Sequence, residues 1–275
     1  MSVLSSAHVQ TPFCDGRTPA PEMARAAYEK GFVSLGFSSH APQTFDPPCC
    51  IAPSREDAYK AQIRALQAEY EGRMRIYLGI ERDAFACVGP EDYEYFIASV
   101  HYLPLNGEYV AVDGAPEDLL RCVNEGCGGD ALGMARQYFS LLGDYVLRDH
   151  PPIIGHFDLL RKNNTSLHLL DEESPAYRNL ALETLKALSE TGAFLEVNTK
   201  AMLKGRLKTP YPASFLLSAW KDWGGEVIIN SDCHDAKYLD AFYPEAEALL
   251  LSLGYDHAVR LGAKEMWERY PLSAP

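Results

Sequence analysis

Long hydrophobic runs and an excess of basic residues are both missing from this 275-residue sequence. No apolar stretch approaches the ~20 residues that span a bilayer, and residues 1–5 lack the basic start and apolar core of a signal peptide. With 38 acidic and 25 basic residues, the formal charge is −13, which would repel a phosphate backbone and an anionic membrane surface. We therefore expect no nucleic-acid partner and no membrane association.

Paired cysteine motifs are missing as well. Seven cysteines is an odd number, and Cys49 and Cys50 are adjacent, which suits neither a disulfide framework nor a CxxC zinc knuckle. Reduced thiols in a cytoplasmic protein are the simplest interpretation. The hydrophobic content of 47% is that of a globular chain with a substantial core and argues against disorder.

Short apolar runs alternate with amphipathic stretches, which is typical of βα units and a parallel sheet. Helices are predicted over residues 18–30, from 54 to about 70, and over 130–148, 174–191, 214–223 and 242–253. Residues 54–57 have a capping-box spacing. Segments 41–53 and 106–129 are predicted to be long loops that cover or shape a site. No repeat, low-complexity tract or linker divides the chain, so we expect one domain over residues 1–275.

Six apolar runs each lead to a residue with a polar side chain that can bind a metal. The runs 32–37, 76–80, 96–100, 153–154, 193–197 and 227–229 lead to His40, Glu81, His101, His156, Asn198, and Asp232 with His234. One histidine after a strand is more often structural than functional. Several at equivalent places predict strands of one barrel that present ligands at their carboxyl ends. The pattern indicates a polynuclear metal hydrolase.

The candidate metal ligands carry imidazole, carboxylate or amide groups. They are His8, Gln10, Asp15, His40, Glu81, His101, His156, Asp232 and His234. Imidazole and carboxylate together suit zinc, iron or manganese, and Glu81 is expected to bridge two cations. Clustered metals lower the pKa of a bridging water toward ~7 and hold the oxygens of a phosphoryl group, so we expect hydrolysis of a phosphate ester. His150, His168 and His257 are expected to be structural.

The motifs around these residues resemble those of the polymerase-and-histidinol-phosphatase (PHP) superfamily. Residues 8–16 (HVQTPFCDG) resemble the opening HxHTxFCDG motif. The resemblance continues, in family order, through LGFSSHAP, YLGIERD, ASVHYL, IIGHFDLL, LEVNT, TPYPAS and INSDCHD. It is greatest to the stand-alone histidinol-phosphatase branch. It implies an α/β fold, a distorted (β/α)7 barrel, that holds two or three divalent metals (zinc, iron or manganese) and hydrolyses L-histidinol phosphate in histidine biosynthesis.

The resemblance also implies roles for individual residues. The first metal would be held by His8, Glu81 and Asp232, and the second by Glu81, His101 and His156. His40 and His234 would hold a third metal or face the phosphate. The expected catalytic residues are Asp232, His234 and His40. The phosphate is expected to bind Arg161, with Lys204 and Arg206 as the alternatives.

One position departs from the family motif. Gln10 stands where the second histidine of HxH is expected, and an amide oxygen is a weaker, uncharged ligand. The first metal is therefore expected to bind loosely or be absent. Asp15, which follows the FC dipeptide, is either a substitute ligand or a turn residue.

Three other functions remain open from the sequence. A PHP phosphatase for a nucleotide or sugar phosphate shares the ligands, because loops around the pocket select the substrate. A weakly active homologue is suggested by Gln10. A regulatory or proofreading module of a DNA polymerase is disfavoured by the charge of −13 and by the absence of polymerase sequence. The oligomeric state cannot be predicted.

Overall fold

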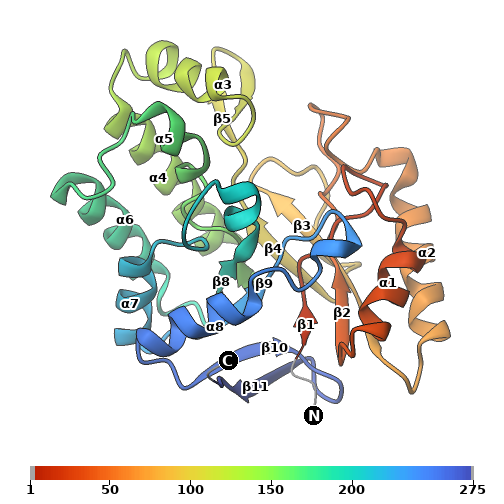
Figure 1. The fold of residues 1–275 in the computed structure, drawn as a ribbon. Helices are drawn as coiled ribbons and strands as arrows, with labels where there is room; N and C mark the ends of the chain where they lie inside the picture. The colour runs from red at the N-terminus through yellow and green to blue at the C-terminus, as the bar shows by residue number, and fades with distance from the viewer. Residues whose placement is uncertain (1–3, 274–275) are drawn as a thin grey trace.

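The computed structural model describes residues 4–273 and places a mostly parallel sheet between flanking helices (Figure 1). The sheet order is β1-β2-β3-β4-β7-β8-β9-β10-β11. The strands are β1 (Ser5–Ser6), β2 (Ser34–Phe37), β3 (Arg75–Asp83), β4 (Tyr95–Ser99), β7 (Ile153–Ile154), β8 (Phe194–Asn198), β9 (Val227–Asn230), β10 (His257–Leu261) and β11 (Trp267–Pro271). Neighbouring strands are parallel except for β10 and β11. The α/β class predicted from the sequence is confirmed.

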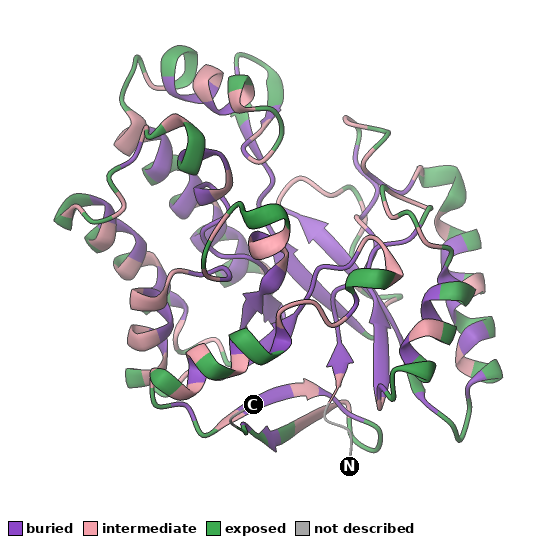
Figure 2. Ribbon diagram, in the orientation of Figure 1, coloured by how far each residue is buried: buried purple, intermediate pink, exposed green. Residues whose placement is uncertain are grey.

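All six predicted helices are present, with ends close to those expected. The helices are α1 (Ala20–Glu29), α2 (Glu56–Glu69), α3 (Pro116–Arg121), α4 (Ala131–Asp149), α5 (Arg161–Leu167), α6 (Pro175–Leu188), α7 (Ser214–Asp222) and α8 (Tyr243–Ser252). Asp130 and Ser174 begin α4 and α6 by accepting hydrogen bonds from Gly133 N and Tyr177 N, as N-cap residues do. The strands β2, β3, β4 and β9 are largely buried, β11 is partly exposed, and the helices expose their outer faces (Figure 2).

Two local predictions are wrong. Residues 53–55 form a 3-10 helix, η1 (Pro53–Arg55), and α2 begins after Arg55 without a side-chain cap, so Ser54 does not start a capping box. The predicted loop 106–129 is also largely ordered. It contains β6 (Glu108–Ala111), which pairs with β5 (Tyr102–Leu105), then α3 and the π-helix η2 (Cys122–Gly126). Its elements are too short to give a hydrophobic period.

Side chains of the sheet alternate between two hydrophobic clusters, as expected for a strand buried on both faces. Ile76 and Leu78 of β3 belong to the cluster under the helices, and Tyr77 belongs to the other. The second cluster consists of Ala7, Tyr77, Tyr95, Ile97, Ile153, Ile228 and Leu261. Tyr77 and Leu261 share this cluster although β3 and β10 are far apart in the sheet order.

The ring of Tyr95 belongs to this second cluster, which we call the inner cluster. A Cβ at Gly79 would lie 2.2 Å from Tyr95 Cζ, and one at Gly36 would lie 2.2 Å from Tyr95 Oη. Both positions therefore require glycine for close approach. Tyr95 Oη donates a 2.6 Å hydrogen bond to Ala7 O. The ring thus fills the interior one layer below the carboxyl ends of the strands.

The chain after β1 pairs with the chain after β9 through a bridge outside the named strands. Val9 and Cys233 form a parallel bridge. Gln10 N donates to Cys233 O at 2.8 Å, and Cys233 N donates to His8 O at 3.0 Å. The segment after β1 therefore lies beside the segment after β9. Between residues 4 and 273 there is no helix with the length and apolar character that crossing a membrane requires.

Candidate metal centre

Four histidines converge on the buried carboxylate of Glu81 at the carboxyl ends of the strands. His8 Nε2 and His40 Nδ1 lie 2.8 Å and 3.1 Å from Glu81 Oε2. His156 Nε2 and His101 Nε2 lie 3.0 Å and 3.3 Å from Glu81 Oε1. Parallel strands end at one edge, which explains why residues distant in sequence meet here. We call these five residues the Glu81 cluster.

Two histidines of the Glu81 cluster are oriented by a second carboxylate. His8 Nδ1 lies 2.7 Å from Glu196 Oε1, and His101 Nδ1 lies 3.3 Å from Asp83 Oδ2. A carboxylate partner favours the proton on Nδ1, so in the neutral ring the Nε2 lone pair points toward Glu81. Two lone pairs that face each other need a cation between them. Metal-binding histidines characteristically have such a carboxylate behind the ring, so the arrangement fits a metal ion.

The charges around the Glu81 cluster favour cations. Burial acts to raise the pKa of Glu81, but His8, His40 and His101 hold it well below its usual range. Burial acts to lower the pKa of His101, yet Glu81 and Asp83 raise it to about 9. Metal ions bind by displacing protons from such groups, so the same field attracts a divalent cation.

The buried ring of His156 also fits a metal site. Its Nδ1 is buried and has no hydrogen-bond partner within residues 4–273, although buried polar atoms are normally paired. Its backbone N–H donates to Glu196 Oε2 at 2.9 Å. His40, Glu81 and His101 have donor atoms close enough to share one ion.

A second group with suitable spacing lies on the more exposed side, and consists of Asp15, His40 and His234. His234 Nε2 is 3.1 Å from Asp15 Oδ2, and His40 Nε2 is 3.7 Å from Asp15 Oδ1. His234 Nδ1 is 2.9 Å from the carbonyl oxygen of Asp232. Because a carbonyl only accepts, Nδ1 carries the proton and the Nε2 lone pair faces Asp15 and Lys200. Asp15 therefore lies among the ligand candidates rather than in an isolated turn.

Gln10 presents nitrogen, not oxygen, to the Glu81 cluster. Its Nε2 donates to Glu81 Oε2 at 2.7 Å, and its Oε1 accepts from the thiol of Cys14 at 3.2 Å. A carboxylate oxygen at 2.7 Å can only be approached by the NH2 group. The amide in this orientation offers a hydrogen-bond donor where a histidine would offer a lone pair.

A lysine that sequence reasoning missed lies at the same site. Lys200 Nζ donates to Asp232 Oδ1 at 3.1 Å and to His234 Nε2 at 3.2 Å. It belongs to η3 (Thr199–Gly205), which directly follows β8. Asn198, the last residue of β8, donates to Asp232 Oδ2 at 3.2 Å. The available signal was the position of Lys200 two residues after Asn198, the last residue of the LEVN strand.

Asp83 and Glu196 were also missed, although the strand period points to them. Asp83 lies two residues after Glu81 on β3, and Glu196 lies two residues before Asn198 on β8. Alternate residues of a strand share a face, so both carboxylates point the same way as the ligand candidate beside them. Glu196 also accepts from Asn230 Nδ2 at 3.0 Å.

The three basic residues predicted to bind phosphate do not contact the Glu81 cluster. Arg161 Nε donates to Glu172 Oε2 at 2.8 Å, and its Nη1 lies 3.5 Å from Asp158 Oδ2. Its Nη2 makes no hydrogen bond to any residue in the described range 4–273. Lys204 and Arg206 are exposed, at the end of η3 and just after it.

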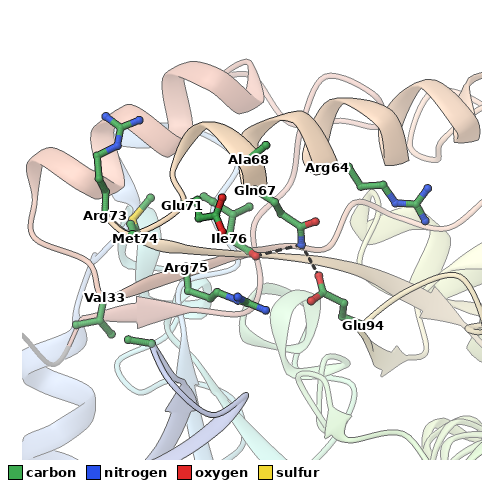
Figure 3. A pocket seen from close by; sticks show the side chains of 12 residues that line it. Val33, Arg64, Gln67, Ala68, Glu71, Arg73, Met74, Arg75, Ile76 and Glu94 are labelled. Atoms are coloured by element: carbon green, nitrogen blue, oxygen red, sulfur yellow. Dashed lines mark hydrogen bonds between the residues drawn. The ribbon is translucent and has the colours of Figure 1, made fainter.

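A cavity of about 580 Å³ lies at the opposite end of β3 (Figure 3). Its lining includes Arg64, Arg73 and Arg75, and none of the candidate ligands. The guanidinium groups of Arg73 and Arg75 lie over the rings of Tyr70 and Tyr77. The cavity is thus separate from the metal centre.

The parallel α/β fold and the ring of histidines around a buried glutamate define an α/β protein whose site has the donor groups to hold divalent metal ions. The chain belongs to the PHP domain family, whose model matches residues 6–200. This confirms the resemblance read from the sequence motifs.

Individual relatives agree with that membership. The chain is 31% identical over 249 residues to the "Probable histidinol-phosphatase" of Deinococcus radiodurans, and the alignment covers 85% of this chain and 87% of the relative. It is 27% identical over 252 residues to the histidinol-phosphatase of Bacillus subtilis, covering 83% and 92%. A solved histidinol phosphate phosphatase from Lactococcus lactis, complexed with zinc, L-histidinol and phosphate, superimposes with a TM-score of 0.70 at 21% identity, covering 94% and 97%. The last similarity supports the fold.

Proposed function

We propose that this protein is a metal-dependent phosphomonoesterase that hydrolyses L-histidinol phosphate to histidinol and phosphate, as a step of histidine biosynthesis. The observation that carries the proposal is the convergence of four histidines on Glu81 in a chain of the PHP domain family. Curated relatives at 31% and 27% identity are named histidinol-phosphatases. The zinc, L-histidinol and phosphate in the Lactococcus lactis structure support a divalent metal and a small phosphorylated substrate.

Two or three divalent ions of zinc, iron or manganese are proposed. Glu81, His101 and His156 would hold one ion, and Asp15, His40 and His234 another. His8, Gln10, Glu81 and Asp232 form the remaining candidate set. When bound, the ions would supply Lewis acidity to a phosphoryl oxygen and lower the pKa of a water toward ~7.

The chain's own residues orient and bind the reactants. Asp83 and Glu196 hold the rings of His101 and His8 in place, which fixes the direction of their Nε2 lone pairs. Of the proposed catalytic residues, Asp232 is buried, whereas His40 and His234 have side chains 16% and 18% exposed and lie where a leaving alcohol oxygen would take up a proton. That location suits proton transfer.

Arg161 is the proposed phosphate-binding residue, with Lys204 and Arg206 as alternatives. Its Nε and Nη1 are held by Glu172 and Asp158, so the guanidinium is fixed in direction. Nη2 remains available to donate to an outer phosphoryl oxygen. An arginine held this way loses little side-chain freedom when it binds an anion.

We also propose that residues 1–275 form a single domain with the topology of a distorted (β/α)7 barrel. The Val9–Cys233 bridge and the inner cluster shared by β3 and β10 support closure of the sheet. The odd number of cysteines, two of them adjacent, supports a reducing compartment, and we propose the cytoplasm.

A panel of phosphate monoesters tests the substrate. Protein with measured metal content would be assayed with L-histidinol phosphate, a nucleoside monophosphate and a sugar phosphate. We expect kcat/KM for L-histidinol phosphate to exceed the others by about 10²-fold or more, since a site built for a polar group rejects ligands that lack it. A preference for another ester would identify a different PHP phosphatase. No turnover by the metal-loaded protein would identify a weakly active homologue.

A further inference from the structure

The two carboxylates that define the first candidate metal set already accept hydrogen bonds from side-chain N–H groups of the chain. Asp232 Oδ1 accepts from Lys200 Nζ at 3.1 Å, and Asp232 Oδ2 accepts from Asn198 Nδ2 at 3.2 Å. Glu81 Oε2 accepts from Gln10 Nε2 at 2.7 Å. These N–H groups occupy lone pairs and space on the sides of Asp232 and Glu81 where a metal ion held by both would bind.

The positive charge of Lys200 also disfavours a metal ion at Asp232. An ammonium at 3.1 Å from Asp232 Oδ1 already supplies a positive charge at that carboxylate, and a divalent ion on the same oxygen would lie a few ångström from it. Two cations at that separation repel strongly in a largely buried site. Lys200 therefore competes with a metal ion for Asp232, and it is tethered to the chain.

The other candidate sets do not depend on Asp232. The groups whose donor atoms lie close enough to share an ion are His40, Glu81 and His101, and Asp15, His40 and His234. Among the described residues, no such group includes His8 or Asp232. Lys200 also contacts His234, but its side chain is 38% exposed and can leave His234 while it keeps Asp232.

We propose that Lys200, together with the Gln10 amide, takes the place of the metal ion beside Asp232, so that the protein holds two ions and a tethered ammonium. The ammonium supplies one fixed positive charge where a metal would supply two. Lys200 also has N–H groups to donate to a phosphoryl oxygen of the substrate. This role rests on the proposed function, since it assumes a metal-dependent phosphatase site.

Metal stoichiometry tests the proposal without relying on turnover. The full chain would be saturated with zinc, desalted and analysed for zinc per chain, with a thermal melt to verify folding. The variants are Lys200→Met, Gln10→His, the two combined, and Lys200→Arg, which retains the charge. Lys208→Met is the matched control, because Lys208 is an exposed lysine in the same stretch of chain.

We expect about two zinc ions per chain for the wild type, for Lys200→Arg and for Lys208→Met, and one further ion for the combined variant, whose freed carboxylates and added imidazole can bind it. Three ions in the wild type, no gain in the combined variant, or an equal gain in Lys200→Arg would overturn the proposal. If Lys200→Met does not fold, Lys200→Gln combined with Gln10→His provides the same test. Failure of the proposed function would show differently, as a wild type with two ions and no hydrolysis of L-histidinol phosphate.

Discussion

The buried and the exposed sides of the metal centre are built in different ways. On the buried side, Glu81 and His156 are 1% and 2% exposed, and the His101 ring is held from behind by Asp83. On the other side, Asp15 and His234 contact each other, with side chains 35% and 18% exposed. Ligands fixed by a second layer of carboxylates are pre-organised before a metal arrives. The exposed ligands can adjust to a substrate, so we expect the buried side to set metal retention.

The largest effect that would follow from this difference is at Glu81. Glu81→Gln removes the carboxylate that faces all four histidines, so it should reduce metal content by more than one ion per chain. Loss of metal Lewis acidity amounts to several kcal/mol, so activity should fall by about 10³-fold or more. Elemental analysis and kcat/KM check both. The control is His168→Asn, at an exposed αL position that asparagine tolerates, which should change neither metal content nor kcat/KM. A metal content equal to that of the wild type in Glu81→Gln would contradict the bridging role.

Removal of a supporting carboxylate should have the next largest effect. Glu196→Gln retains the shape of the side chain but weakens its hold on His8 Nδ1 and on the backbone of His156. Changes of this kind lower metal affinity by about 10–100-fold. Competition with a chelator measures the affinity. Asp235→Asn alters a partly exposed carboxylate paired with Lys237 and should leave metal affinity unchanged. Equal affinities in the two variants would remove the distinction between the buried and exposed sides.

Phosphate binding should be affected less than metal binding. Arg161→Ala removes a charged donor worth ~1.5–3 kcal/mol, so the inhibition constant of inorganic phosphate should rise by about 10-fold or more while metal content stays at the wild-type level. The same inhibition constant is measured for Lys204→Ala and Arg206→Ala. If it rises in one of these variants and not in Arg161→Ala, the phosphate-binding role would pass to that residue.

The smallest expected effect is a gain. Gln10→His replaces an N–H donor with an imidazole nitrogen, which binds zinc or iron better than an amide does. Zinc affinity at limiting metal should rise by less than ~10-fold while Lys200 remains, and by more in the Lys200→Met background, because the two residues act on neighbouring carboxylates. Parallel zinc titrations of the wild type, Gln10→His, Lys200→Met and the combined variant measure this coupling. Equal affinities throughout would leave Gln10 with a purely structural role.

Much of the centre could be predicted because its residues follow strands at equivalent positions. His40, Glu81, His101 and His156 could be identified in this way, and the structure brings them together. Lys200 was missed because its place two residues after Asn198 does not by itself indicate its contact with Asp232, 32 residues away in the sequence. The orientation of the Gln10 amide depends likewise on Cys14 and Glu81.

Prediction of the fold was limited in the same way, because short elements depend on contacts with distant residues. Long periodic segments such as α4 were predicted almost to the residue, since a stripe of apolar residues specifies a helix locally. The elements β6, α3 and η2 were mistaken for a loop because each is only four to six residues long. β1 has two residues and carries no pattern of its own, and its strand character comes from pairing with β2.

Tyr95 closes the inner side of the site. Its ring packs against Gly36 and Gly79 beneath the ligands, so among residues 4–273 the interior below the metal centre is filled and substrate approaches from the carboxyl ends of the strands. Under the proposed function, the phosphoryl end of the substrate enters first and lies deepest. The alcohol must then depart before the phosphate, and accumulated phosphate competes with incoming substrate for the same opening. A filled interior thereby imposes an order of product release.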